Sequence, residues 1–151
     1  MKRVLIVLLS VLLAAMISVS AAADTVYVLC QPDSFVNVRQ FPNKRSEIAG
    51  RVELGDHLET DGKRKNGFIH VFGTFDGDAW ISAGFVTRDP VTVKRLETEI
   101  VSKGRVACRR SVKGQRRKWA KNGQKVTIYA FSDGWSITDQ GFIQTRFLGV
   151  F

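Results

Sequence analysis

The chain has few of the residues that carry metal or covalent chemistry. Its 151 residues include only two Cys and two His, too few for a four-ligand zinc site unless carboxylates join them. No pairing of a Cys with a His, and no pair of carboxylates, has a spacing typical of a catalytic site. We therefore expect no cofactor, no metal ion and no enzymatic activity.

Proline and helical periodicity are also scarce. Three Pro and 13 Gly give no collagen-like or low-complexity character, and no stretch after the N-terminal region has a helical period longer than a turn. The apolar and charged fractions, 44% and 25%, are those of a folded chain and exclude general disorder. The length suits one domain or two very small ones.

The first 23 residues have the layout of a secretory signal peptide. Lys2 and Arg3 precede an apolar run from Val4 to Val19, and small residues follow as far as Ala23. The apolar run has 16 residues, slightly fewer than the ~20 that span a bilayer, so a retained membrane anchor is the alternative. We predict cleavage after Ala23, an extracytoplasmic location and no stable membrane span in the cleaved chain.

Positive charge is concentrated in the second half of the chain. Residues 24–89 hold 8 basic and 10 acidic residues, whereas residues 90–151 hold 13 basic and 4 acidic ones. Nine Lys and Arg fall between residues 105 and 125 without one acid. Like charges repel, so a purely solvated surface would favour interspersed acids, whereas a bound polyanion relieves the repulsion and releases counterions.

This basic run predicts a polyanion site, with a solvated loop and strand face as the alternative. Arg binds phosphate through two parallel hydrogen bonds, and Trp119 within the run offers a stacking surface for a sugar or a base. Outside the cytoplasm the available polyanions are teichoic acid, lipopolysaccharide, anionic lipid and free nucleic acid. The candidate residues are Arg105, Arg109, Arg110, Lys113, Arg116, Arg117, Lys118, Trp119 and Lys121.

Five sequence features recur in the same order, which indicates two copies of one unit of ~60 residues. The pairs of matching segments are Val36–Arg39 with Val106–Arg109, Gly55 with Gly123, Gly67-Phe68 with Gly134-Trp135, Trp80-Ile81 with Phe142-Ile143, and Phe85-Val86 with Phe147-Leu148. Short runs of Val, Ile, Phe and Tyr, separated by Gly, Asn and Asp, predict β-strands in both copies. Five or six short strands in so small a unit favour a closed barrel, because closure removes unpaired strand edges.

The first copy resembles the bacterial SH3-like domain. Asn37-Val38-Arg39, Pro42, Gly55, Gly67-Phe68 and Trp80-Ile81 follow the order of short motifs common in that family. The second copy departs more, since Ala107-Cys108 replaces Asn-Val and Phe142 replaces the second Trp. The resemblance implies an all-β chain of two small SH3-like barrels. After the signal peptide at 1–23, we place the domains at 24–89 and 98–151, with a linker at 90–97.

The resemblance also implies an extracytoplasmic binding module, often for cell-wall peptide or glycan, without chemistry of its own. We expect attachment to cell-wall peptidoglycan or an anionic envelope polymer through the basic second unit. The alternative is a secreted adaptor or inhibitor that docks on an acidic protein, and a third interpretation is binding of extracellular nucleic acid. Any selective groove would lie on the first unit.

Three aromatic residues fall outside the repeated positions. Phe41, Phe72 and Phe75 lie in predicted loops or at strand ends, so they are candidates for a groove of the kind that SH3-like folds use for extended peptides. The repeated aromatics, among them Trp135 and Phe147, are expected mainly in the cores.

The two cysteines lie one in each unit. An exported chain with two Cys favours a disulfide, so we predict a Cys30–Cys108 bridge that closes a loop of about 80 residues. The alternative is that Cys108 is a small apolar strand residue, at the position where the first unit has Val38, and that Cys30 is free.

Overall fold

The computed structural model describes residues 23–73, 75 and 77–149. The predicted signal peptide therefore lies outside the described residues, except for Ala23. The described chain is all-β, as predicted, and its only helical segments are two short 3-10 turns, η1 (Ala83–Phe85) and η2 (Thr145–Phe147). Among these residues no helix is long and apolar enough to cross a membrane.

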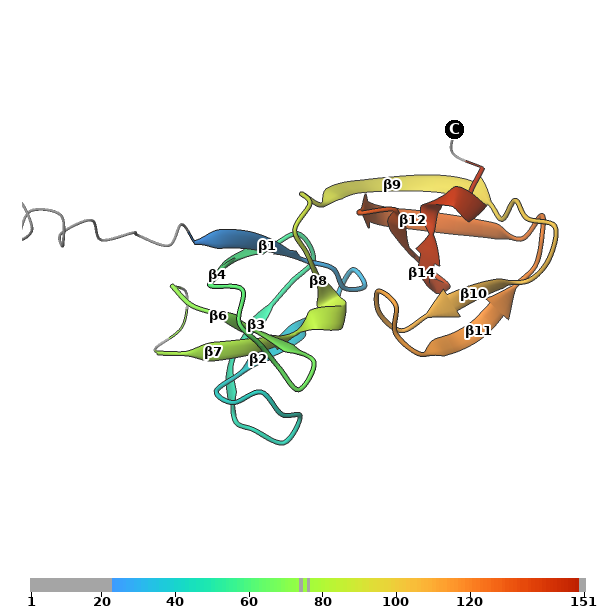
Figure 1. Cartoon of the computed structure of the whole chain (residues 1–151). Helices are drawn as coiled ribbons and strands as arrows, with labels where there is room; N and C mark the ends of the chain where they lie inside the picture. The colour runs from blue at the N-terminus through green and yellow to red at the C-terminus, as the bar shows by residue number, and fades with distance from the viewer. Residues whose placement is uncertain (1–22, 74, 76, 150–151) are drawn as a thin grey trace, which may run out of the picture.

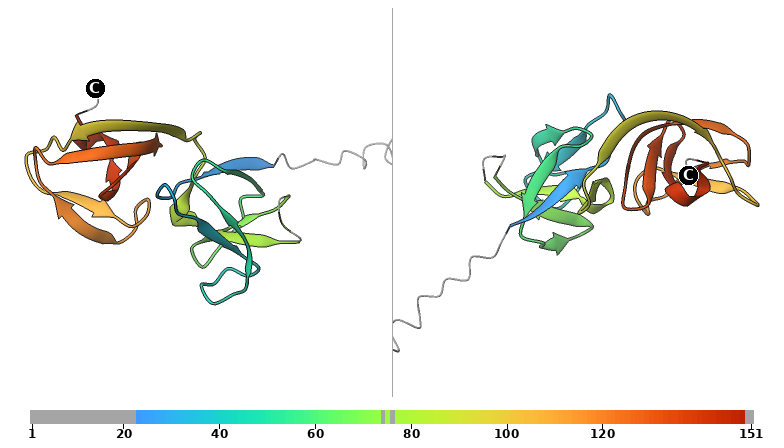
Figure 2. Two further views of the ribbon diagram at one scale, coloured as in Figure 1. Left: turned by 180° about the vertical axis from the view of Figure 1, so that it is seen from behind. Right: turned by 90° about the horizontal axis from the view of Figure 1, so that it is seen from above.

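The chain forms two small β-structures that lie side by side (Figures 1 and 2). We call them the first unit and the second unit. Strands of the first unit are β1 (Asp24–Val28), β2 (Val36–Arg39), β3 (Ile48–Val52), β4 (His57–Thr60), β5 (Arg64–Lys65), β6 (Phe68–Val71), β7 (Ala79–Ser82) and β8 (Val86–Thr87). Strands of the second unit are β9 (Thr92–Glu99), β10 (Val106–Arg109), β11 (Arg116–Ala120), β12 (Lys125–Ser132), β13 (Trp135–Thr138) and β14 (Gly141–Gln144).

In the first unit, two antiparallel sheets enclose one apolar core. Their strand orders are β4-β1-β8 and β3-β2-β7-β6-β5, and a bridge between Glu59 and Phe72 joins them. Alternate residues of the strands point inward, as in β2, where Val36 and Val38 are buried and Asn37 is not. The alternation of Val with polar residues that predicted this strand therefore also sets its inner face.

The second unit is one antiparallel sheet in the order β11-β10-β14-β13-β12-β9. Its inner face holds a separate core that includes Ile100, Val106, Val126, Ile128 and Ile143. β9 covers most of the segment predicted as the linker, and it pairs with β12 along its length. Figure 1 shows β9 running over the top of the second unit as its outermost strand.

Equivalent backbone hydrogen bonds recur in the two units, which supports the predicted duplication. Both Gly67 and Gly134 accept a bond from the first residue of the following 3-10 turn, at 2.9 Å in each case. Three further bonds match between the units. Val28 N to Asp56 O (2.7 Å) corresponds to Ile100 N to Gln124 O (2.9 Å), and Gly55 N to Val28 O (3.0 Å) corresponds to Gly123 N to Ile100 O (2.7 Å). Leu29 N to Phe85 O (2.8 Å) corresponds to Val101 N to Phe147 O (2.9 Å). The second unit thus repeats the chain path of the first.

Two tight hairpins also match. Asn66-Gly67 joins β5 to β6 with φ of 51° and 78°, and Asp133-Gly134 joins β12 to β13 with φ of 48° and 68°. Positive φ at both central residues defines the turn that fits the twist of a hairpin, and Asn-Gly and Asp-Gly adopt it most readily. The Gly, Asn and Asp residues expected between the strands therefore form turns at both places.

The units contact each other through an apolar cluster. Phe85 of the first unit packs edge-on against Phe142 of the second, with ring centroids 6.4 Å apart. Leu29 is buried in the same cluster, with Trp135 and Ile137 on the outer face of the second sheet. One backbone hydrogen bond crosses the junction, from Val112 N to Gly84 O at 3.0 Å.

The predicted Cys30–Cys108 disulfide is wrong for this structure, because both thiols are free and buried. Cys30 belongs to the core of the first unit and Cys108 to the core of the second, so each side chain points into its own unit. Cys108 occupies the inward position of β10 that Val38 occupies in β2, as the alternative proposed. Burial raises the pKa of the Cys30 thiol to about 11 and raises that of Cys108, so burial disfavours the thiolate at both positions.

Candidate polyanion interface

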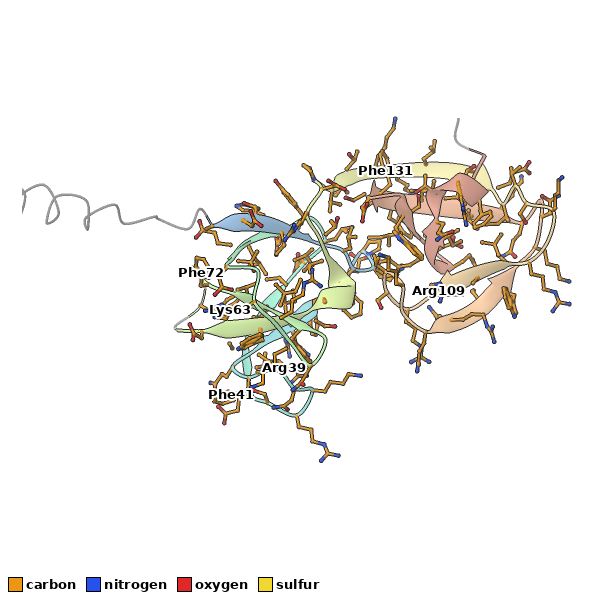
Figure 3. All side chains as sticks on the ribbon, viewed as in Figure 1. Arg39, Phe41, Lys63, Phe72, Arg109 and Phe131 are labelled. Atoms are coloured by element: carbon orange, nitrogen blue, oxygen red, sulfur yellow. The ribbon has the colours of Figure 1, made fainter. Side chains whose placement is uncertain are left out.

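The predicted polyanion residues lie on one hairpin at the edge of the second unit. We call residues 105–121, which comprise β10, β11 and their connecting loop, the basic hairpin. β11 is the strand at this edge of the sheet. In Figure 3 the labelled residue Arg109 marks the position of β10. The structure thus brings together Arg105, Arg109, Arg110, Lys113, Arg116, Arg117, Lys118, Trp119 and Lys121.

These cations are not neutralised within the described part of the chain. Each is exposed except Arg109, which is partly buried. Four ion pairs are present among the described residues, and all of them lie in the first unit. The basic hairpin therefore presents its positive charge to solvent without protein carboxylates against it.

A β-bulge places an arginine on the face of Trp119. Trp119 pairs with Ala107, but the register shifts after Cys108, so that Arg109 pairs with Arg116 and Arg117 is the extra residue. Directly paired residues point to the same side of a sheet, so Arg116 and Trp119 share a face although they are three residues apart. The Arg116 guanidinium lies 4.5 Å from the centre of the Trp119 ring.

Beside this pair is a groove with an aromatic and arginine lining. It has a volume of about 210 Å³ and is lined by Arg105, Val106, Ala107, Arg109, Trp119, Trp135, Gln144 and Phe147. Trp119 is 46% exposed, whereas Trp135 is 6% exposed and forms the inner part of the lining. We call this cavity the aromatic groove, and none of its lining residues is acidic.

Sequence reasoning missed Trp135, Gln144 and Phe147 as groove residues. Trp135 and Phe147 occupy repeated positions and were expected in the core. Trp135 is buried, but it lies on the outer face of the second sheet. This face contacts both the apolar cluster between the units and the aromatic groove. Arg146 stacks over Phe147 at 4.8 Å, and no local sequence pattern distinguishes this placement from a core position.

The Arg109 side chain is fixed by the fold. Its guanidinium donates a hydrogen bond to Gly114 O at 2.8 Å. In the first unit the equivalent Arg39 donates to Ser46 O at 2.6 Å. This arginine therefore closes the loop after its strand in both units, and in the second unit it also lines the aromatic groove.

The three groove candidates of the first unit are not gathered in one place. Phe41 is 63% exposed in the loop after β2, Phe72 lies just after β6 with its ring 6.0 Å from that of His70, and Phe75 is partly buried against the core. Figure 3 shows Phe41 and Phe72 at different ends of the unit. A peptide groove built from them remains a prediction.

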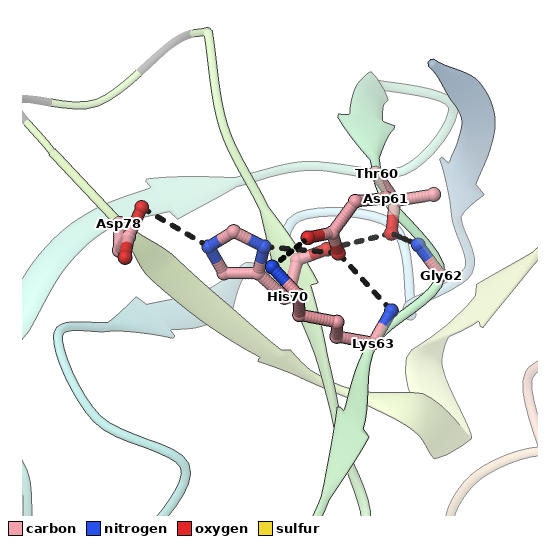
Figure 4. A network of polar contacts seen from close by, with 6 residues as sticks. All are labelled: Thr60, Asp61, Gly62, Lys63, His70 and Asp78. Carbon is pink, nitrogen blue, oxygen red and sulfur yellow. Dashed lines mark hydrogen bonds and ion pairs between the residues drawn. The ribbon is translucent and has the colours of Figure 1, made fainter. Parts of the chain in front are cut away.

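A polar network surrounds His70 in the first unit (Figure 4). The two ring nitrogens lie 3.0 Å from Asp61 Oδ1 and 3.3 Å from Asp78 Oδ1, although neither contact is aligned as a hydrogen bond. Lys63 Nζ lies 2.7 Å from Asp61 Oδ2. Desolvation favours the neutral acid, but hydrogen bonds from Lys63 and the contact with His70 outweigh it and hold the pKa of Asp61 well below its usual range.

This network has a structural rather than a metal-binding geometry. Thr60 Oγ1 donates to His70 O at 2.6 Å and accepts from Gly62 N at 3.0 Å, so the polar groups tie β4 to β6. Across residues 23–73, 75 and 77–149, no three His, Cys, Asp or Glu side chains come together in a way that could hold a metal ion.

Comparisons with known proteins match the first unit to one family. Residues 34–87 match the family of the bacterial SH3 domain. No curated protein matches the chain. Among solved structures the chain is similar to NlpC1 from Trichomonas vaginalis, at 20% identity, 89% coverage of this chain, 48% of that chain and a TM-score of 0.38. NlpC2 from the same organism is 19% identical, with 87% coverage of this chain, 49% of that chain and a TM-score of 0.37. The chain spans about half the length of each.

Proposed function

We propose that this chain is a non-catalytic binding protein of the bacterial cell envelope, exported by its N-terminal segment. Its second unit would be a second SH3-like domain, and the basic hairpin of that unit would attach to peptidoglycan that carries anionic polymer. The observation that carries the proposal is the basic hairpin itself. It gathers eight cations around an exposed Trp119, and none of them has an ion-pair partner in the described structure.

Physical chemistry supports a polyanionic ligand for this surface. Each phosphate neutralised by Lys or Arg releases condensed counterions, which adds affinity that falls as salt rises. The Arg116–Trp119 stack and the aromatic groove add flat surfaces for sugar rings next to the charges. The match of residues 34–87 to the bacterial SH3 domain supports an envelope setting.

Charge reversal on the basic hairpin tests this proposal. We expect Arg116→Glu with Arg117→Glu to lower the salt concentration at which the protein elutes from heparin and to abolish retention on sacculi that carry anionic polymer. The reason is that both exposed arginines begin β11, where it pairs with β10 beside the connecting loop of the basic hairpin. The matched control is Lys44→Glu with Arg45→Glu, which reverses two exposed charges in a loop of the first unit and should leave elution nearly unchanged.

Pulldown on purified peptidoglycan separates the proposed ligand from its alternatives. Sacculi are compared before and after removal of anionic polymers, at low and high salt. Binding that is lost on stripping supports the proposal. Equal elution of the hairpin variant and wild type contradicts it. So does failure to bind either kind of sacculus while the protein retains DNA at physiological salt or captures an acidic protein.

A further inference from the structure

A second cavity lies where the basic hairpin meets the first unit. It has a volume of about 340 Å³ and is lined by Gln31, Arg109, Arg110, Arg117 and Gly141. We call it the arginine pocket. Gln31 comes from the first unit, directly after Cys30, and the other four residues come from β10, β11 and β14 or the residue next to them.

The lining holds three guanidinium groups and no carboxylate. Three cations around one cavity repel each other, and the repulsion is strongest where water is partly excluded. The neighbouring cavity, which also includes Gln31, has a different balance, because Arg95 there is accompanied by Asp33 and Asp139. Of these two cavities that include Gln31, only the arginine pocket has cations in its lining without a carboxylate.

An unsatisfied donor provides an independent sign of a ligand. Gln31 Nε2 is buried and has no hydrogen-bond partner among the described residues. A buried N–H group without an acceptor is unfavourable, so such groups in folded proteins usually face an acceptor from the protein, water or a ligand. Gln31 also lines the arginine pocket, so a turn of its side-chain amide towards the cavity would bring this donor to an oxygen atom bound there.

The fold fixes the backbone of the pocket walls and one of the three guanidinium groups. Arg109 is tied to Gly114 O at 2.8 Å, and Arg110 N donates to Gln115 O at 3.0 Å. Arg117 is the extra residue that the bulge adds to β11, and it lines the pocket. Gly141 has a φ of 118°, and a Cβ there would lie 2.6 Å from Arg109 O, so only glycine lets β14 approach β10 this closely.

The fold does not itself require these arginines. Of the three pocket arginines, only Arg109 has an arginine counterpart in the first unit, which is Arg39. Gln40 takes the place of Arg110 and makes the equivalent backbone hydrogen bond to Glu47 O at 3.1 Å. The first unit closes its own, longer loop at residues 40–47 with Arg39 as the arginine tied to the loop backbone. The additional guanidinium groups of the second unit are therefore available for a ligand.

We propose that the arginine pocket binds one phosphate group of a phosphorylated ligand. Arg109, Arg110 and Arg117 supply charge-assisted hydrogen bonds to its oxygens, and Gln31 Nε2 donates a further one. The volume leaves room for a phosphate with the first atoms of a flanking sugar or polyol. The inference deepens the proposed function, because it identifies the group of the anionic polymer that this part of the hairpin recognises.

NMR titration with inorganic phosphate at constant ionic strength tests the pocket. We expect the side-chain amide signals of Gln31 to shift and saturate with phosphate and not with chloride. Arg117→Ala should weaken phosphate binding at least about tenfold, since one of three guanidinium groups is lost. The control, Lys94→Ala with Lys103→Ala, removes two exposed charges of the second unit outside the basic hairpin and should change phosphate binding less than about twofold.

The result that overturns the inference is a shift without saturation, or an equal loss in Arg117→Ala and the lysine control, because both indicate diffuse attraction. Gln31→Ala separates the inference from the proposed function, because it removes a pocket donor without changing the charge. Phosphate binding by this variant is read from the backbone amide signals of Arg110 and Arg117. Loss of phosphate binding with unchanged elution from heparin supports the pocket. Unchanged phosphate binding in Gln31→Ala overturns the assignment of the donor, whatever the polymer result.

Two sources of the phosphate group are distinguished by parallel titrations. One uses glycerol 1-phosphate as a soluble fragment of a polyol-phosphate polymer, and the other uses vesicles of phosphatidylglycerol. Competition between inorganic phosphate and glycerol 1-phosphate for the Gln31 signal supports the pocket and a polymer source. Competition by vesicles alone supports the pocket with a lipid headgroup, and competition by neither overturns the inference.

Discussion

At the scale of single residues, the position of Asp61 shows how partners determine charge. Its carboxylate lies between the Lys63 ammonium, at 2.7 Å, and His70 Nδ1, at 3.0 Å. These contacts lower its pKa below the usual value of about 4. The native state therefore binds a proton at Asp61 less readily than the unfolded chain does, and the contact stabilises the fold above that usual pKa.

Acid should remove this stabilisation. We expect Asp61→Asn to lower the free energy of unfolding by about 0.5–1 kcal/mol at pH 7. The difference from wild type should narrow as the pH falls from about 5 towards 2, because the unfolded chain takes up a proton at Asp61 near the usual pKa while the native carboxylate stays charged to lower pH. Urea unfolding at several pH values measures this. Glu97→Gln removes an exposed carboxylate of β9 as a control, and a difference for Asp61→Asn that stays constant with pH contradicts the prediction.

At the scale of elements, neighbouring residues determine the tight turns, whereas the alignment of distant strands determines the bulge in β11. The Asn66-Gly67 and Asp133-Gly134 turns follow directly from dipeptides that tolerate positive φ. The bulge in β11 does not, because it depends on how β11 aligns with β10. It moves Arg116 to the side of Trp119, whereas a regular strand places residues three apart on opposite sides.

The approach of β14 to β10 gives an element-scale prediction. We expect Gly141→Ala to lower the free energy of unfolding by about 1–3 kcal/mol, because the added Cβ meets Arg109 O and because φ is positive. Gly104→Ala is the matched control, since a Cβ there meets nothing within 4 Å. The urea concentrations at the unfolding midpoints of both variants test this prediction. Equal midpoints would show that β14 can move away from β10 at little cost.

At the scale of the whole molecule, the junction changes the environment of equivalent residues. Leu29 and Val101 make matching backbone hydrogen bonds in the two units, yet Leu29 is buried and Val101 is exposed. The second unit covers Leu29 through the cluster that contains Phe85 and Phe142. Apolar burial of this kind should couple the unfolding of the two units.

Disruption of the junction should uncouple the units. Val112 contacts the junction cluster from the tip of the basic hairpin, so Val112→Asp introduces a charge there without altering either unit core. We expect amide NMR signals of the two units to disappear at one urea concentration in wild type and at two in the variant. Val101→Asp, at an exposed position of the second unit, should keep one transition. Coincident loss in Val112→Asp would show that the junction does not couple the units.

Alternating Val, Ile and Phe with polar residues, together with Gly, Asn and Asp at the turns, determined the strands. The run of Lys and Arg between residues 105 and 125 determined the concentration of cations in one hairpin. These features depend on neighbours in the chain, so the sequence alone predicts them. The tertiary structure decided which residues meet. It separates Cys30 from Cys108 in two cores, stacks Arg116 on Trp119 through a register shift, and places Gln31 beside three arginines of the other unit. Such contacts depend on strand alignment and on the packing of distant segments, which no local pattern specifies.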